Sequence, residues 1–335
     1  MIGKIIERGI KLNEIPIILE DYLNYMETIK GTSPNTTKEY FYDLRTFFRF
    51  IKFRYKLVKE DTPFDQIDIS DIDLGTIKKI NLQDLHAFIS FSDKQLGNNN
   101  YTKSRKVASL KSFFDYLHSK VDLIDKNPAI NLEFPKTDNR HPVYLTLDEC
   151  KVLLNTILEN KNDFFRKRDY AIVMLFLNCG LRLSELSSID MNRIKKDTLT
   201  VIGKGAKERT IYLNDACVKA IHDYIKVRPN DAIDKDALFL SKRKRRMSNR
   251  AIQHMIDKYL ERAGFDTQIY STHKLRHTAA TLMYKHGNVD IRALQEILGH
   301  ENVSTTQIYT HIDDERLRQA IKSNPLGNIN LKDDK

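Results

Sequence analysis

The sequence predicts a mainly α-helical protein of two domains, with one small antiparallel sheet in the second domain. Apolar residues recur at three- and four-residue spacing through most of the chain, as amphipathic helices require. Strand-like alternation occurs in one stretch only, and a polar, proline-bounded segment interrupts the helical pattern near the middle. The length of 335 residues also exceeds the usual size of a single domain.

The first domain is expected over residues 14–130 and contains four predicted helices. Their apolar faces place them at about 18–29, 37–55, 82–91 and 103–120. Between the second and third helices lies an acidic segment, 59–79, which contains Pro63 and Gly75 and shows no sustained helical period. We expect a long loop there with one turn of helix, and we assign it no function.

A linker is expected at residues 131–141, followed by a second domain over 142–335. Thr146 and Glu149 form a capping-box pattern that predicts the start of a helix. The stretch DTLTVIGKGAKERTIYLN predicts strands at 199–202 and 210–213 around a Gly-Lys-Gly turn, which places Lys204 at or near the tip of a hairpin. Helices are expected again from Asp215 onward.

The charge balance favours a polyanionic partner. The chain has 55 Lys and Arg against 45 Asp and Glu, a formal net charge of +10. Nucleic acid or an anionic membrane surface would suit such a charge, and an ordinary solvated basic surface is the alternative. Hydrophobic residues at 41% are sufficient for two cores.

Targeting and cysteine patterns indicate a cytoplasmic protein. The N-terminal stretch lacks an apolar run long enough for a signal peptide, and the most apolar stretch, from Tyr170, is too short to cross a bilayer. Cys150, Cys179 and Cys217 lie far apart without any CxxC pattern, so neither a disulfide framework nor a zinc ribbon is predicted.

Tyr309 lies in an unusually polar segment, LGHENVSTTQIYTH. A tyrosine phenol is a poor nucleophile unless cationic donors or a base activate it. The second domain supplies five candidates for that purpose: Arg182, Lys204, His273, Arg276 and His300. Arginine forks match phosphate geometry, and fixed donors can stabilise a phosphorane, so these groups indicate phosphoryl transfer. HKLRH lacks the glutamate of a zinc HExxH site, and no metal or cofactor is expected.

Each residue alone also has an ordinary structural interpretation. Arg182 could form a simple salt bridge with Glu185, Lys204 could be a turn lysine, His273 could cap a helix, and Tyr309 could be a packed aromatic. None of these interpretations predicts the other motifs. The occurrence of all the motifs in one chain therefore favours the catalytic interpretation.

The motifs resemble those of the tyrosine recombinases, and closely those of the Xer branch. CGLRLSEL, VIGKGAKER, HKLRHTAATLM, LGHENVSTTQIYTH and DERLRQ fall in the family's order. The resemblance implies a SAM-like core-binding domain followed by the tyrosine recombinase catalytic fold. It also implies a site-specific recombinase that cleaves and rejoins DNA through a 3′-phosphotyrosyl intermediate.

The resemblance assigns a role to each candidate. Tyr309 would attack the scissile phosphate, while Arg182 and Arg276 would hold its non-bridging oxygens and His300 would donate a further hydrogen bond. Lys204 would protonate the 5′-oxygen leaving group. His273 would move the proton of the nucleophile. Glu185 would stabilise the region around Arg182. The role of His311 stays open.

DNA contacts are expected on both domains, with a solvated basic face as the alternative. In the first domain the candidates are Lys38, Arg45, Lys103, Arg105 and Lys106. In the second they are Lys207, Arg209, Lys242, Arg243, Arg245, Arg246, Asn249 and Arg250. The run KRKRR could also be a nuclear-localisation signal, but a loop that grips phosphates suits a bacterial-type enzyme better. Asn249 and Arg250 would begin a helix that could reach base edges.

The family resemblance also implies the partners. We expect duplex DNA with a specific recombination site, a homo- or hetero-tetramer on two sites, exchange of residues 314–327 between neighbours, and a DNA translocase as a candidate partner. No membrane partner is expected, and the protein should be cytoplasmic and nucleoid-associated.

Three functions remain open from the sequence. The first is Xer-type resolution of chromosome or plasmid dimers, and the second is integration or excision of a phage or conjugative element. About fifteen residues precede the first predicted helix, which leaves no room for the additional arm-binding domain of many integrases. The third is a DNA-binding regulator whose cleavage is incidental.

Overall fold

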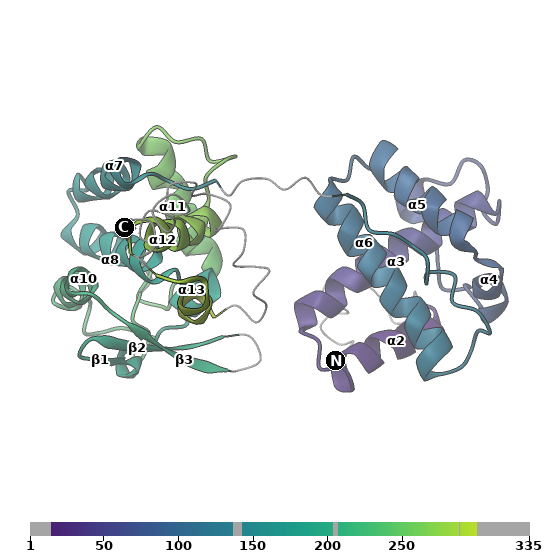
Figure 1. The fold of residues 1–335 in the computed structure, drawn as a ribbon, viewed down its shortest axis with the longest axis horizontal. Coiled ribbons are helices and arrows are strands. Elements are labelled where there is room, and N and C mark those ends of the chain that lie inside the picture. The colour runs from purple at the N-terminus through teal and green to yellow at the C-terminus, as the bar shows by residue number, and fades with distance from the viewer. Residues whose placement is uncertain (1–14, 137–142, 204–206, 288, 300–335) are drawn as a thin grey trace, which may run out of the picture. The chain divides into compact units, whose positions relative to one another are not determined.

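Helices form most of the computed structural model, which describes residues 15–136, 143–203, 207–287 and 289–299. The chain divides into two units, Met1–Asn139 and Arg140–Lys335 (Figure 1). The described strands form one three-stranded antiparallel sheet in the second unit. The predicted fold class, mainly α with a small antiparallel sheet, is confirmed. Part of the expected linker, 137–141, lies outside the described residues.

Four long helices form the first unit. They are α2 (Ile17–Thr28), α3 (Pro34–Arg54), α5 (Leu82–Lys94) and α6 (Asn100–Asp115), the last continued by a π-helical turn, η3 (Tyr116–Lys120). Side-chain caps fix three of the starts: Ser33, Asn81 and Asn99 each accept a hydrogen bond from a backbone N–H of the first turn. Aromatic rings fill the core between these helices, and Phe47 lies 5.1 Å from Phe88, measured between ring centroids.

The acidic segment 59–79 is more ordered than predicted. It contains a short 3₁₀ helix, η2 (Phe64–Gln66), and α4 (Leu74–Lys79) instead of one turn in a loop. Ile67, Ile69 and Ile72 are buried, and Lys52 on α3 donates a 2.7 Å hydrogen bond to Asp71. The segment therefore packs as part of the first unit's core.

The second unit is built around α8 (Asp163–Cys179), whose apolar residues are almost all buried. The elements near it in sequence are α7 (Leu147–Leu158), α9 (Leu183–Ser187) and η4 (Met191–Arg193). The later helices are α10 (Asp215–Ile225), α11 (Asn249–Arg262), α12 (Thr272–His286) and α13 (Ile291–Leu298). Helix α8 contacts α7, α10 and α12. The predicted capping box of Thr146 and Glu149 begins α7.

The sheet has the order β1 (Ile194–Lys195), β2 (Thr198–Ile202) and β3 (Glu208–Tyr212) (Figure 1). Strands β2 and β3 form the predicted hairpin, with Val201 opposite Arg209, although β3 begins two residues earlier than expected. The backbone N–H of Gly203 donates a 2.8 Å hydrogen bond to the carbonyl of Lys207 and closes the connection. Lys204 lies outside the described residues.

Candidate active site

A tight turn after α8 positions Arg182. Gly180 adopts a left-handed backbone conformation, with φ of +59°, and ends the helix. A Cβ atom at Gly180 would come within 2.7 Å of a methyl carbon of Leu298. Glycine therefore provides both the backbone conformation and the space that this turn needs. Two residues later, Arg182 stands at the N-cap of α9.

The carboxylate of Glu185 lies at the centre of a group of arginines. It is 1% exposed and accepts hydrogen bonds from Arg182 Nη1 at 2.8 Å, Arg209 Nη1 at 2.7 Å and Arg209 Nη2 at 3.1 Å. Arg276 Nη1 lies 4.0 Å from Oε2 of the same carboxylate. Three positive charges thus face one negative charge. We call Arg182, Glu185, Arg209 and Arg276 the Glu185 cluster, and its excess positive charge suits an anionic ligand.

The C-terminal end of α13 holds two of these arginines. Arg182 Nη2 donates to the carbonyl of Gly299, and Arg276 Nη2 donates to the carbonyl of Leu298, both at 2.6 Å. Arg276 Nη1 also donates to the carbonyl of Gly180 at 2.6 Å. Carbonyls at a helix end have no partner within the helix, so the arginines satisfy them and are themselves fixed. The structure therefore brings Arg182, Glu185 and Arg276 together.

His273 precedes Arg276 by one turn of α12. Its ring packs edge-on against that of His277, with 4.5 Å between the centroids. His273 keeps contact with solvent, yet its pKa is lowered from the usual 6.5, first by desolvation and then by the charges of Arg276 and Lys274. The imidazole therefore favours its neutral form, which can accept a proton.

The sequence predicts that Arg209 contacts DNA, but in the structure its side chain binds a carboxylate within the protein. Its side chain is 17% exposed, and both terminal nitrogens bind Glu185. Burial, the first cause, and the charge of Arg182 lower its pKa, while Glu185 opposes them. Strand alternation could have revealed this placement, because Arg209 shares a face of β3 with Ile211, which is buried.

Several predicted residues lie outside the described ranges. They are Lys204, His300 and Tyr309, together with His311 and the segment 314–327. His300 directly follows Gly299, whose carbonyl binds Arg182. Among the described residues, no group of three or more His, Cys, Asp or Glu side chains could hold a metal ion.

The predicted DNA contacts of the first unit are mostly engaged within the protein. Lys106 is 5% exposed, and its ammonium donates a 3.0 Å hydrogen bond to Asp43, which also binds Arg105 at 2.6 Å. Lys103 pairs with Asp93. This burial gives Lys106 a structural role, and we remove it from the candidate DNA contacts.

Lys38 and Arg45, also in the first unit, lie against aromatic rings. The guanidinium carbon of Arg45 is 4.9 Å from the centroid of the Tyr42 ring, and the ammonium of Lys38 is 5.7 Å from the same centroid. Both side chains are half-buried, so part of each faces solvent.

In the second unit the basic segment before α11 is mainly exposed. The exposed candidates are Lys207, Lys242, Arg243, Arg245, Asn249 and Arg250. Arg246 is an exception, because its guanidinium donates to the carbonyls of Ser187 and Ile189 and pairs with Asp190. It fastens this segment to the end of α9.

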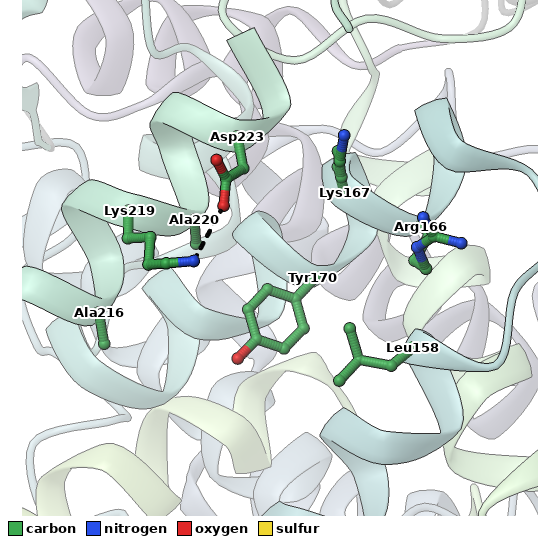
Figure 2. Close-up of a pocket in the computed structure, with 8 residues that line it drawn as sticks. All are labelled: Leu158, Arg166, Lys167, Tyr170, Ala216, Lys219, Ala220 and Asp223. Carbon is green, nitrogen blue, oxygen red and sulfur yellow. Dashed lines mark hydrogen bonds and ion pairs between the residues drawn. The ribbon is translucent and has the colours of Figure 1, made fainter. Parts of the chain in front are cut away.

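A separate pocket of about 320 Å³ lies between the end of α7, the start of α8 and α10 (Figure 2). Arg166, Lys167 and Lys219 line it, but their charges are already paired with Asp163 and Asp223. It contains no predicted functional residue. Within the described part of the chain, no helix is long and apolar enough to span a membrane.

The model of the phage integrase family matches residues 143–316. The chain is 57% identical to the tyrosine recombinase XerC of Caldanaerobacter subterraneus subsp. tengcongensis over 93% of this chain and 87% of that protein. It is 35% identical to XerC of Shewanella amazonensis over 90% of this chain and 93% of that protein.

Solved structures share the fold. The XerH recombinase bound to a palindromic difH substrate in a post-cleavage complex has a TM-score of 0.68 and 20% identity, over 91% of this chain and 94% of that one. The Tn1549 transposon integrase in complex with a circular intermediate DNA has a TM-score of 0.69 and 20% identity, over 91% and 98%.

Proposed function

The chain belongs to the phage integrase family as a site-specific tyrosine recombinase of the Xer type, and we propose that the Glu185 cluster is the centre where it cleaves and rejoins DNA. One observation carries the proposal. Arg182 and Arg276, which are far apart in sequence, are fixed on the adjacent carbonyls of Gly299 and Leu298. They lie beside a buried carboxylate that cannot neutralise all the positive charge around it.

The reaction exchanges one phosphoester bond for another. The phenolic oxygen of Tyr309 attacks the scissile phosphorus, and the bond from phosphorus to the 5′-oxygen breaks. His273 accepts the phenol proton, and Lys204 gives a proton to the leaving 5′-oxygen. A 3′-phosphotyrosyl link and a free 5′-hydroxyl result. Attack of a 5′-hydroxyl from another strand on this link reverses the steps and rejoins the DNA.

The arginines stabilise the transition state of both steps. Guanidinium groups that are already fixed need little reorganisation when charge develops on the phosphate oxygens. Arg182 and Arg276 are held by backbone carbonyls beside Glu185, and the planar fork of N–H donors in each guanidinium matches the two non-bridging oxygens of a phosphate. His300 adds a further donor. Loss of one such fixed donor typically slows catalysis by about 10² to 10³.

The neutral state of His273 supports its part in this reaction. The lowered pKa keeps the imidazole unprotonated at neutral pH, so it can accept the phenol proton. Desolvation and two neighbouring cations produce this state, and the same cations would favour the phenolate of Tyr309.

The biological role is resolution of chromosome or plasmid dimers by strand exchange between two specific sites. Similarity to XerC proteins at 57% and 35% identity supports this role over integration of a mobile element. The enzyme acts as a tetramer on two sites, with residues 314–327 exchanged between neighbours and with a DNA translocase as a further partner. Lys207, Lys242, Arg243, Arg245 and Arg250 contact DNA phosphates, and Asn249 contacts a base edge.

A nicked duplex tests the cleavage chemistry. The binding site is first selected from genomic fragments that the purified protein retains, and a nick near the cleavage point then lets the short strand diffuse away and traps the covalent product. We expect a covalent protein–DNA adduct with the wild-type chain and none with Tyr309→Phe. The absence of an adduct from the wild type, or an adduct from Tyr309→Phe, would contradict the proposal.

Gene deletion tests the biological role. Loss of dimer resolution should produce chained, unsegregated chromosomes in dividing cells. Normal segregation in the deletion strain would count against the housekeeping role and leave the cleavage chemistry untouched.

A further inference from the structure

Arg246 joins the basic segment 242–250 to α9, the helix that begins at Arg182. We infer that Arg246 is a positioning residue, which sets where Arg182 lies relative to the DNA that this segment binds. The inference rests on the proposed function, in which the segment contacts DNA and Arg182 holds the scissile phosphate. Arg246 is half-buried, whereas its neighbours Arg243 and Arg245 are exposed.

The guanidinium of Arg246 binds the chain at the C-terminal end of α9. Nη1 donates to the carbonyl of Ser187 at 3.1 Å and to that of Ile189 at 3.0 Å. Nη2 pairs with the carboxylate of Asp190. Carbonyls at a helix end have no partner within the helix, so Arg246 satisfies them. Because the guanidinium is planar and rigid, these contacts fix the orientation of the bound chain as well as its distance.

The backbone at Arg246 is also held in place. Its N–H donates a 2.7 Å hydrogen bond to Oδ2 of Asp234. The next residue, Met247, is buried, and its N–H donates to the carbonyl of Phe239 at 3.0 Å. Both ends of the Arg246 side chain are therefore fixed. A displacement of the basic segment by DNA would be passed to the end of α9.

A second contact links the same two elements. The hydroxyl of Ser187, the last residue of α9, donates a 2.5 Å hydrogen bond to Oδ1 of Asn249, the first residue of α11. Asn249 is the residue that we propose to contact a base edge. The end of α11 that reads DNA is thus tied to the helix end that Arg246 binds.

Helix α9 connects these contacts to Arg182. Arg182 stands at its N-cap, and the carbonyl of Arg182 accepts a 3.0 Å hydrogen bond from the N–H of Leu186. The helix has five residues, and at 1.5 Å per residue it is about 7.5 Å long. A misplacement of about 1 Å can slow a reaction by about 100-fold. This short connection therefore determines whether DNA held by the basic segment presents its phosphate correctly to Arg182.

Arg228 offers a matched control. It is also half-buried, and its guanidinium donates to the carbonyls of Lys235 and Ala237 at 2.8 Å and to that of Leu238 at 3.3 Å. Arg228 thus fixes the second unit by the same kind of contact. None of these carbonyls belongs to α9 or to the basic segment, so loss of Arg228 would leave the connection to Arg182 in place.

The test measures single-turnover cleavage of the nicked duplex at saturating protein, and the affinity for the same DNA over a range of salt concentrations. We expect Arg246→Met to slow saturated cleavage by at least about 10-fold. The slope of log affinity against log salt should not change, because Arg246 binds no phosphate. Arg245→Met, which removes an exposed neighbour, should reduce that slope by about 1.

Two further variants complete the comparison. Arg228→Met should match the wild type in both the saturated rate and the salt slope. Arg246→Lys, which retains a positive charge beside Asp190, should recover part of the rate that Arg246→Met loses. A purely structural role for Arg246 would not separate the saturated rate from the salt slope in this way.

Three outcomes would overturn the inference. The first is a wild-type rate for Arg246→Met at saturating protein. The second is a smaller salt slope for this variant, which would make Arg246 a phosphate contact. The third is an equal slowing by Arg228→Met, which would indicate a general loss of structure. If thermal unfolding shows that Arg246→Met does not fold, a wild-type rate for Arg246→Lys overturns the inference. If the wild type forms no covalent adduct, the proposed function fails, and this inference fails with it.

Discussion

Arg182 donates a 2.6 Å hydrogen bond from Nη2 to the carbonyl oxygen of Gly299, although 117 residues separate them in the sequence. Gly299 ends α13 and is followed by His300, the predicted phosphate donor. This hydrogen bond therefore joins the CGLRLSEL motif, which contains Arg182, to the LGHENVSTTQIYTH motif, which contains Gly299. A substitution at Gly299 can therefore disturb the site without removing a charged group.

Gly299→Ala should disturb the Glu185 cluster. The new methyl group would lie 2.9 Å from Arg209 Nη1, and alanine disfavours the left-handed φ of +62°. We expect a large drop in cleavage rate together with a lower unfolding temperature. Gly264→Ala provides the control, since Gly264 also has a positive φ, +83°, but has nothing within 4 Å of the Cβ position. If the two variants lose stability and activity equally, backbone strain alone explains the effect.

Glu185→Gln should destabilise the second unit. The substitution leaves Arg182, Arg209 and Arg276 facing one another with no negative charge between them. Removal of one partner from a buried ion pair typically costs about 3–5 kcal/mol. Urea unfolding followed by circular dichroism measures the change. Asp148→Asn, which breaks an exposed pair with Lys151, should leave the free energy of unfolding almost unchanged. Similar values for both variants would contradict the central role of Glu185.

The pH profile of cleavage should reflect the lowered pKa of His273. Neutral His273 accepts the phenol proton, so activity should fall on the acid side only below the usual histidine value of 6.5. Removal of a nearby positive charge by Lys274→Gln should raise this pKa and move the acid limb to higher pH. An acid limb above 6.5 in the wild type, or a shift to lower pH in the variant, would exclude this assignment.

The same pKa shift has a consequence for stability. Because the pKa of His273 is lower in the folded chain than in the unfolded chain, the unfolded chain binds the proton more tightly. The contribution of this group to stability is therefore lost as pH falls from 6.5 toward the lowered folded value. Denaturation curves over this interval, compared with those of His273→Gln, would show whether the loss depends on the imidazole.

Lys106 and Lys242 should respond in opposite ways to substitution. Lys106→Met removes the buried partner of Asp43 and should lower the free energy of unfolding by about 3–5 kcal/mol without changing the salt dependence of DNA binding. Lys242→Ala should leave stability within about 0.5 kcal/mol and reduce the slope of log affinity against log salt by about 1, because Lys242 is exposed. A smaller slope of log affinity against log salt for Lys106→Met than for the wild type would indicate that Lys106 contacts DNA.

The sequence predicted much of this architecture because local patterns determine it. The apolar face of 37–55 corresponds to α3, the Thr146–Glu149 capping box begins α7, and alternation around a Gly-Lys-Gly turn gives β2 and β3. The motif order also identified Arg182, Glu185 and Arg276, which the structure brings together.

Long-range pairing of charges could not be predicted in the same way. Charge alone predicts DNA contact for these basic residues, whereas Lys106 and Arg209 bind carboxylates on distant segments of the chain. Two signals pointed to this result. Asp43 lies within the apolar face of α3, where a buried acid needs a cation, and Arg209 alternates with buried Ile211 on β3. Neither signal identifies the partner, because that depends on tertiary packing.

Mass spectrometry of the trapped protein–DNA adduct tests the central claim most directly. After nuclease and protease digestion of the wild-type adduct, we predict one modified peptide, in which Tyr309 carries the nucleotide through a 3′-phosphate. Modification of any other residue, or a link through a 5′-phosphate, would contradict the assignment of the Glu185 cluster and Tyr309 as the centre that cleaves and rejoins DNA.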